Sequence, residues 1–232
     1  MSKLPVPRIA ILASGSGSTA EAYAHAIYDR KVAAKLCVVI SSKADAYILK
    51  RVERWNQEWS FGTKTAVINQ HTHPAGKQPR GQTTEESEAI CALLASNHID
   101  IVVYLGYMRI ASGRLIQEYG FVPGTHTSKY QARSLNSHPG PLPLTADTYG
   151  LGASAKVLEA YNAGHVQESR HTVHVVAQGV DQGPIVAEYS VPIEPRDSPE
   201  TLFARVQLIE KANIAQSVDK FWRDQQAYLL EA

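Results

Sequence analysis

The stretch RIAILASGSGST, residues 8–19, predicts how the fold begins. Residues 8–14 are a nearly continuous apolar run, which is typical of a strand buried on both faces of a parallel sheet. Gly15 and Gly17 follow in a serine-rich loop, and the alanine-rich segment AEAYAHAIYD after it has helical spacing. A strand, a glycine-rich loop and a helix in this order indicate a Rossmann-like first half.

The same alternation of strands and helices continues along the chain. Asp45 is expected to cap the second helix. Alternation of this kind predicts a parallel sheet with helices on both faces. The expected elements are strands at 35–42, 63–68 and 100–108, helices at 45–55, 85–97 and 152–163, and loops or irregular segments at 69–84 and 120–133.

The C-terminal part predicts a different ending for the sheet. Strands are expected at 170–177 and 184–193, and the short QGVDQG link between them permits antiparallel pairing. Ser198 is a suitable cap for a last helix that has Pro199 at its first position and ends near Arg223. We therefore expect a single three-layer α/β domain with a mixed sheet, antiparallel C-terminal strands and a long C-terminal helix.

The composition is that of a globular protein. Of the 232 residues 44% are hydrophobic, and 23 basic and 22 acidic side chains give a net charge of +1. This balance offers no general reason to expect nucleic acid or an anionic membrane as a partner. Cys37 and Cys91 lie in apolar runs, so we expect buried free thiols and a reducing cytoplasm. The N-terminus does not resemble a signal peptide, and no apolar stretch reaches the ~20 residues that a membrane span needs.

The glycine loop is a candidate anion site. Gly15 and Gly17 permit a tight turn, while the free amides and the dipole of the following helix favour a phosphate. Ser16, Ser18 and Thr19 add hydroxyl donors. A plain glycine-rich connection is the alternative, and the position of the loop directly after the first strand favours the phosphate.

The identity of that phosphate stays open at this level. GSGSTA satisfies a relaxed dinucleotide fingerprint, but an NAD enzyme needs an acidic residue at the end of the second strand. Ser41, Ser42 and Lys43 stand there instead, so NAD is disfavoured. Lys43 leaves NADP open, and a phosphomonoester on a small substrate fits equally well.

A second candidate site lies in SLNSHPGPLPLT, residues 134–145. Asn136 and His138 are two residues apart at the end of a predicted strand, so they share one face of the pleat. An amide donor and a proton carrier suit the developing oxyanion of acyl transfer. Asp181 in GVDQGP is the best candidate for the carboxylate that would hold the histidine, although an aspartate in a turn is also common.

Several segments together resemble the folate-dependent formyltransferases. SLNSHPGPLP resembles the N-x-H-P-x-x-L-P signature of that family, and TVHVVAQGVDQGPIV resembles its second signature, with the aspartate in a D-x-G-P context. ILASGSGST, SSKADAY and YLGYMRI are similar to segments of one branch, the phosphoribosylglycinamide (GAR) formyltransferases. The matches keep their order along most of the chain.

This resemblance implies a reaction and a set of roles. A formyl group would pass from the co-substrate 10-formyltetrahydrofolate to the amine of GAR in purine synthesis, without metal. Asn136 and His138 would stabilise the tetrahedral intermediate, with His138 as general acid, and Asp181 would support protonated His138 and help to move the proton from the amine. The other expected contacts are Gly15, Ser16, Gly17, Ser18 and Thr19 with the phosphate, Glu210 with the glycinamide end, and Met108, Arg109, Ile110, Ala111, Gln178, Gly179 and Val180 with folate.

The resemblance also implies an organisation and leaves alternatives. Residues 1–110 would form the phosphate-binding half and 111–232 the folate and catalytic half of one domain, in a monomer or homodimer without nucleic acid or membrane partners. Thr19 stands where the family usually has Asn, and Arg80 is the nearby candidate for a folate-contacting arginine. The altered segment around Tyr149 leaves open a nucleotide-linked amino sugar as acceptor, or hydrolysis of the folate. A module that only binds NADP or another nucleotide is the alternative from another class.

Overall fold

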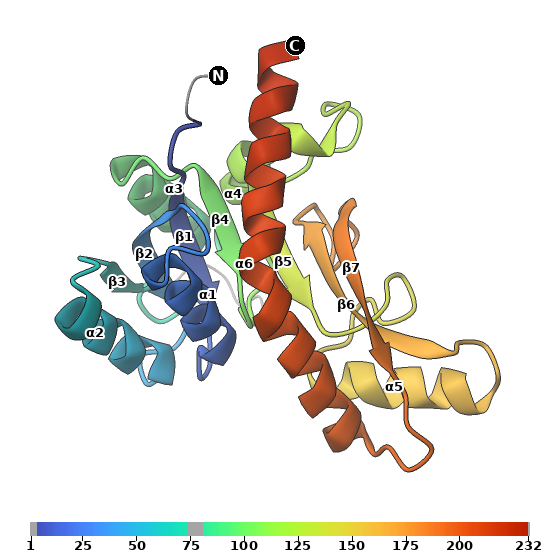
Figure 1. Ribbon diagram of the computed structural model, residues 1–232. Coiled ribbons are helices and arrows are strands. Elements are labelled where there is room, and N and C mark those ends of the chain that lie inside the picture. The colour runs from blue at the N-terminus through green and yellow to red at the C-terminus, as the bar shows by residue number, and fades with distance from the viewer. Residues whose placement is uncertain (1–3, 74–80, 232) are drawn as a thin grey trace.

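A seven-stranded sheet organises the residues that the computed structural model describes, 4–73 and 81–231 (Figure 1). Its strands lie in the order β3-β2-β1-β4-β5-β6-β7. They are β1 (Arg8–Ala13), β2 (Lys35–Ser41), β3 (Lys64–Val67), β4 (Ile101–Tyr104), β5 (Ser134–His138), β6 (Glu168–Val175) and β7 (Ile185–Pro192).

The pairing of the strands confirms the predicted mixed sheet. β1 pairs in parallel with β2 and β4, β2 with β3, and β4 with β5. β6 runs antiparallel to both β5 and β7, because the connection between β6 and β7 is too short for a crossover. The first half is thus Rossmann-like and the C-terminal strands form the predicted antiparallel extension.

Helices cover both faces of the sheet and make the three predicted layers. Ile9 and Ile11 of β1 face the hydrophobic cluster that includes residues of α1, α2 and α6. Ala10 and Leu12, which alternate with them, face the cluster on α3 and α4. The helices are α1 (Ser18–Tyr28), α2 (Tyr47–Trp59), α3 (Thr84–Ser96), α4 (Gly113–Tyr119), α5 (Leu151–Asn162) and α6 (Pro199–Glu231), with a short 3₁₀ helix at Lys129–Gln131.

The last helix is longer than predicted. α6 begins at Pro199, and the backbone amide of Thr201 donates to the Ser198 hydroxyl, so the predicted cap is confirmed. The expected end near Arg223 is wrong, since the helix continues to Glu231. Its final turns are held by tertiary contacts: buried Gln225 donates from Nε2 to the carbonyl oxygens of Tyr130 and Ala132, at 2.9 and 2.7 Å.

Two other local predictions are corrected. Asp45 does not cap α2, because Ala46 is the capping residue and Asp45 is exposed. The amide of Ile48 in the first turn instead donates to the carbonyl of Gly15, at 3.2 Å, so tertiary structure replaces the side-chain cap. The predicted strand at 100–108 ends at Tyr104, and Gly106 follows with φ of 70°.

The two cysteines are buried and free, as expected. Within the described ranges 4–73 and 81–231, no helix is both long and apolar enough to cross a membrane.

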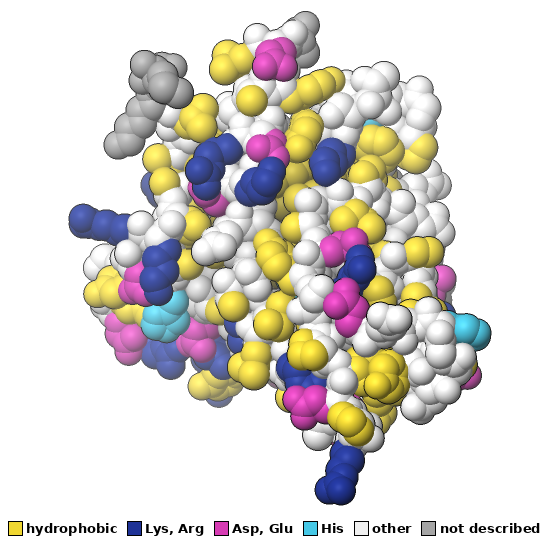
Figure 2. All heavy atoms as spheres, turned by 45° about the vertical axis from the view of Figure 1, so that its right-hand side comes forward, with side chains coloured by type: hydrophobic (Ala, Val, Ile, Leu, Met, Phe, Trp, Pro, Cys, Tyr) yellow, Lys and Arg dark blue, Asp and Glu magenta, His cyan; other side chains and the backbone are white. Residues whose placement is uncertain are grey.

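The face in Figure 2 carries Lys and Arg side chains interspersed with Asp and Glu side chains. The expected loop at 69–84 and the residue Arg80 fall partly or wholly in 74–80, outside the described residues.

Candidate active site

The cavity of interest lies where the order of the sheet strands reverses. The chain runs from β1 outward to β2 and β3, and then returns to place β4 on the other side of β1. The loops after β1 and β4 meet there, and the amide of Ser14 donates to the carbonyl of Gly106 at 3.0 Å. A cavity of about 330 Å³ opens at this edge. Such a topological switch point is the usual ligand site of an open α/β sheet.

The glycine loop forms one wall of this cavity with residues 15–19. Gly17 is the capping residue of α1 and has φ of 71°, and no side chain caps the first turn. A Cβ at Gly17 would lie 2.3 Å from Cδ1 of Ile48, so α2 packs against the loop where only glycine fits. The first amides of α1 therefore lie at the cavity, in the arrangement that favours an anion.

The predicted Asn–His–Asp set comes together in the structure. Nδ2 of Asn136 lies 3.2 Å from Oδ1 of Asp181, and Nδ1 of His138 lies 3.3 Å from Oδ2 of the same carboxylate. Asn136 and His138 share one face of β5, as expected, and all three residues line the cavity. Sequence spacing predicted the pair on β5, and the β6–β7 loop brings the carboxylate to it.

His174 on β6 completes this cluster. It pairs with Asn136 across the β5–β6 ladder, and its Nε2 lies 3.0 Å from Nδ2 of Asn136. Its Nδ1 lies 2.9 Å from the carbonyl of Val175, which can only accept, so Nδ1 carries a proton. Nε2 also lies 3.4 Å from Oδ1 of Asp181. In the neutral ring Nε2 accepts from Asn136, whereas in the protonated ring it donates to Asp181. The two amide hydrogens of Asn136 are thus directed at His174 and Asp181.

Thr145 holds the second nitrogen of His138. Its Oγ1 lies 2.8 Å from Nε2 of His138 and 2.9 Å from the carbonyl of Pro141. The single hydroxyl hydrogen can go to either neighbour. When His138 is protonated, Thr145 accepts from Nε2 and donates to Pro141; when Nε2 is bare, Thr145 can donate to the ring. The fully buried hydroxyl therefore accommodates both protonation states of a proton-carrying histidine.

The carboxylate of Asp181 is kept ionised by its neighbours. Burial opposes its negative charge, but the hydrogen bonds and charges of His138 and His174 outweigh burial and lower the pKa of Asp181 well below its usual range. The backbone of Asp181 is in the left-handed region, with φ of 54°, which aspartate tolerates better than most residues. A Cβ at Gly183 would lie 1.7 Å from the carbonyl oxygen of Val175, so this loop packs directly against β6.

Glu210 reaches the cavity from α6 on the other face of β5. Oγ of Ser137 lies 2.5 Å from Oε1 of Glu210, and the Thr19 side chain also donates to this carboxylate. Burial raises the pKa of Glu210, and these two donors lower it in part. Glu210 and Thr19 were expected at the site, whereas Ser137 and the buried His171 behind it were not.

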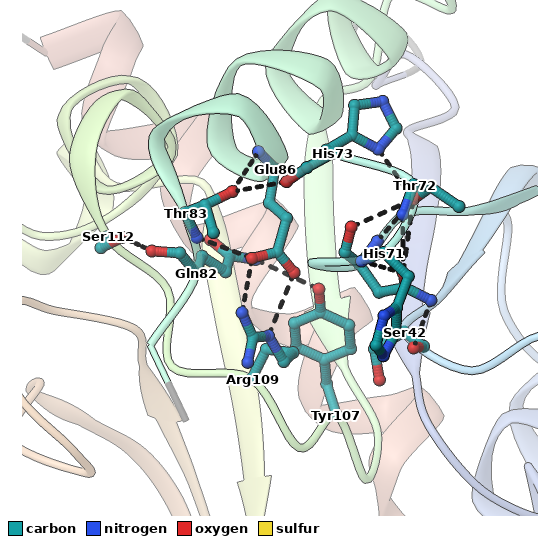
Figure 3. Close-up of polar contacts among 11 residues, drawn as sticks. Ser42, His71, Thr72, His73, Gln82, Thr83, Glu86, Tyr107, Arg109 and Ser112 are labelled. Carbon is teal, nitrogen blue, oxygen red and sulfur yellow. Dashed lines mark hydrogen bonds and ion pairs between the residues drawn. The ribbon is translucent and has the colours of Figure 1, made fainter. Parts of the chain in front are cut away.

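The expected folate contacts are mostly at the cavity. Met108, Arg109, Ile110, Ala111, Gly179 and Val180 line it, whereas Gln178 is exposed and does not belong to the lining formed by the described residues. Figure 3 shows the Arg109 guanidinium directed at the fully buried carboxylate of Glu86, with Nε at 3.0 Å from Oε1. Glu86 also accepts from the amide of Thr83, so Arg109 is attached to the first turn of α3.

Further lining residues carried no distinctive sequence signal. Tyr104, Phe203 and Gln207 line the cavity but look like ordinary strand and helix positions in the sequence. Thr145, which holds His138 but does not line the cavity, ends the quoted stretch 134–145, and nothing in that stretch distinguished its hydroxyl. Among the described residues, no group of three or more His, Cys, Asp or Glu side chains could hold a metal ion.

The fold, together with the Asn–His–Asp cluster beside the glycine loop, defines an α/β class of enzymes that perform acyl-group chemistry. Within that class the chain belongs to the formyl transferase family, whose model matches residues 7–218. This result confirms the resemblance that the two sequence signatures indicated.

Individual relatives agree with this assignment. A phosphoribosylglycinamide formyltransferase of Haemophilus influenzae is 33% identical over 198 residues, which cover 85% of this chain and 79% of that protein. The human trifunctional purine biosynthetic protein adenosine-3 is 33% identical over 203 residues; these cover 88% of this chain but only 17% of that protein. The crystal structure of glycinamide ribonucleotide transformylase 1 from Symbiobacterium toebii matches with a TM-score of 0.75 and 29% identity, covering 94% of this chain and 89% of that one.

Proposed function

We propose that this chain transfers a formyl group from 10-formyltetrahydrofolate to the amine of 5′-phosphoribosylglycinamide, a step of purine synthesis. The observation that carries the proposal is one cavity lined by both the glycine loop at 15–19 and the cluster of Asn136, His138 and Asp181. The relative from Haemophilus influenzae is named for this activity, and the match covers most of that protein. The net charge of +1 is in keeping with small-molecule substrates.

The glycine loop would hold the phosphate of the ribonucleotide. The amides at the start of α1, including that of Thr19, and the hydroxyls of Ser16 and Ser18 are suitable donors for it, while the single hydroxyl hydrogen of Thr19 goes to Glu210. Glu210 would accept from the amine of the glycinamide. The folate would lie between residues 108–111 and the loop that carries Gly179 and Val180. The division into a phosphate-binding half up to about residue 110 and a catalytic half after it follows from this arrangement.

The chemistry would proceed through a tetrahedral intermediate. The amine nitrogen attacks the formyl carbon, and the carbonyl oxygen becomes an oxyanion that Asn136 and His138 stabilise by donation. One amide hydrogen of Asn136 would leave Asp181, its more distant partner, to do so. His138, whose two ring nitrogens contact Asp181 and Thr145, would donate one N–H group to the substrate in place of one of these contacts. His138 then protonates the departing folate nitrogen, and the proton released by the amine returns to His138 with the help of Asp181.

The decisive experiment is an absorbance assay for release of tetrahydrofolate, with the protein, 10-formyltetrahydrofolate and GAR. We expect a rate that depends on GAR and that falls by a factor of roughly 10²–10⁴ in Asp181→Asn, because an acid–base partner is lost. A circular dichroism spectrum of the variant serves as the control for folding.

The assay separates the alternatives. A rate that does not depend on GAR would indicate hydrolysis of the folate. Saturable folate binding without turnover would retain the donor and point to another amine, such as a nucleotide-linked amino sugar. Normal turnover by Asp181→Asn would contradict the mechanism, and tight NADPH binding without folate binding would contradict the proposed function.

A further inference from the structure

The face of β5 that points away from the Asn–His–Asp cluster carries a second polar chain. Ser137 lies between Asn136 and His138 in the strand and points to the opposite face, toward α6, because neighbouring strand residues face opposite sides. Its Oγ lies 2.5 Å from Oε1 of Glu210 and 2.9 Å from Nε2 of His171 on β6. A histidine, a serine and a carboxylate are therefore connected from the interior of the sheet to the cavity.

The direction of each hydrogen bond in this chain follows from the charge of Glu210. When Glu210 is ionised, its carboxylate can only accept, so Ser137 donates its single hydrogen to it. Ser137 must then accept from His171, whose proton is on Nε2. Burial lowers the pKa of His171 to about 4, and the nearby charge of His138 contributes in the same direction. Neutral His171 thus donates to Ser137 across the range in which enzymes usually work.

The surroundings of His171 leave this donation as its only side-chain hydrogen bond among the described residues. The ring is fully buried and stacks on Tyr189, with centroids 5.8 Å apart. Its Nδ1 has no hydrogen-bond partner in the described part of the chain. A buried nitrogen without a partner costs free energy, so the hydrogen bonds of the His171 ring do not by themselves explain why a histidine occupies this position. Its one hydrogen bond keeps the Ser137 hydroxyl turned toward Glu210.

The charge of Glu210 depends on few groups. The titratable and charged side chains that influence it are His138 on β5 and Lys211 on α6, together with His171 acting through Ser137. Thr19 of α1 and Ser137 are its hydroxyl donors. Since burial makes ionisation of Glu210 costly, two donated hydrogen bonds decide whether it carries the charge that a substrate amine can use.

We propose that Ser137 and His171 are positioning residues that fix the direction and the charge of the Glu210 carboxylate, and thereby set the affinity of the site for the substrate amine. This inference rests on the proposed function, in which Glu210 contacts the glycinamide end. The inference adds that Ser137 positions the group that binds the acceptor amine, whereas its neighbours Asn136 and His138, on the other face of β5, act on the formyl group.

The test is Ser137→Ala in the full chain, with steady-state kinetics for both substrates across pH. We expect KM for GAR to rise roughly 10-fold or more, because a hydrogen bond to a charged group is lost, while KM for 10-formyltetrahydrofolate stays unchanged. The acid limb of kcat/KM for GAR should move to higher pH, since the Glu210 carboxylate loses a donor. His171→Phe, which keeps a ring beside Tyr189, should shift both quantities in the same direction by less.

A matched control is Ser169→Ala. Ser169 is a fully buried serine on β6 whose hydroxyl has no partner among the described residues, so its removal should leave both KM values and the pH profile unchanged. The variant Glu210→Gln distinguishes failure of the positioning role from failure of the role of Glu210 itself. If Glu210→Gln raises KM for GAR but Ser137→Ala and His171→Phe do not, the positioning role is wrong and the proposed function stands. If Glu210→Gln has no effect, the role of Glu210 fails and the inference with it.

Discussion

At the scale of single residues, His138 contacts two partners that differ in their hydrogen-bonding capacity. Asp181 can only accept from Nδ1, whereas Thr145 can either donate to Nε2 or accept from it. A proton carrier needs such a second partner, because a fixed donor would disfavour one of its two protonation states. Thr145 takes part in this arrangement through Pro141, whose carbonyl receives the hydroxyl hydrogen when the ring does not.

Thr145→Val should lower kcat about tenfold, because the isosteric side chain keeps the packing and removes the partner of Nε2. KM for GAR should stay near its original value, since Thr145 is fully buried and does not contact the cavity. Steady-state kinetics check this, and Thr145→Ser, which keeps the hydroxyl, is the control. An unchanged kcat in Thr145→Val would show that Asp181 alone is sufficient to orient the ring.

At the scale of elements, the loop between β1 and α1 is shaped by a contact with α2. Only a residue without a Cβ fits against Ile48 at position 17, and the left-handed backbone there independently favours glycine. The amides at the start of α1 therefore depend on the packing of another helix. The geometry of the anion site and the stability of this corner are coupled.

Gly17→Ala should destabilise the protein by about 2–4 kcal/mol, from backbone strain together with displacement of Ile48. KM for GAR should also rise, because the loop must move. Urea unfolding and steady-state kinetics measure the two effects. Gly15→Ala is the control for stability, since a Cβ added there would meet no atom within 4 Å and its φ is not in the left-handed region; equal losses in the two variants would contradict the explanation.

The end of α6 is a second element that depends on tertiary contacts. Gln225→Ala should reduce the free energy of unfolding by about 2–3 kcal/mol, because the buried carbonyl of Ala132 and the part-buried carbonyl of Tyr130 lose their donor. Activity should be unaffected, since Glu210 lies about 22 Å away along the helix. Chemical denaturation checks the first expectation. The control is Gln226→Ala at a half-buried position, which should lower the free energy of unfolding by less than about 0.5 kcal/mol. Equal losses in the two variants would argue against a role of the Gln225 hydrogen bonds.

At the scale of the whole molecule, buried titratable groups make stability depend on pH. The folded-state pKa of His171 is about 4, below the value of 6.5 expected for an unfolded chain. As the pH falls from 6.5 to 4, the unfolded chain takes up a proton that the folded chain refuses, so stability is lost across this window. Asp181, whose folded pKa is lowered, adds a further loss as the pH falls below about 4.

His171→Phe should therefore lose less stability than the original protein between pH 6.5 and 4, by up to about 3 kcal/mol. Urea unfolding at several pH values measures the difference, in which the carboxyl groups common to both proteins cancel. Exposed His165, replaced by Gln, should behave like the original protein. Parallel stability curves for His171→Phe and the original protein would mean that His171 takes up its proton at the same pH in the folded and the unfolded chain, and would contradict the lowered pKa.

The sequence by itself determined the class of fold and the local chemistry. Alternating strands and helices, the glycine loop after β1 and the Asn–x–His spacing are local patterns, and their physical causes act over a few residues. Two of the boundaries that were wrong, at Asp45 and beyond Arg223, lie where a distant segment supplies the hydrogen bonds: Gly15 for α2, and Tyr130 and Ala132 for α6.

Only the tertiary structure decided which groups meet. The register of β6 against β5 places His174 opposite Asn136 and brings His171 to Ser137, and no local pattern encodes a register between residues 38 and 34 positions apart. The same holds for Thr145 beside His138 and for Glu86 beside Arg109. Contacts of this kind depend on packing across the sheet, which fixes positions that sequence spacing leaves free.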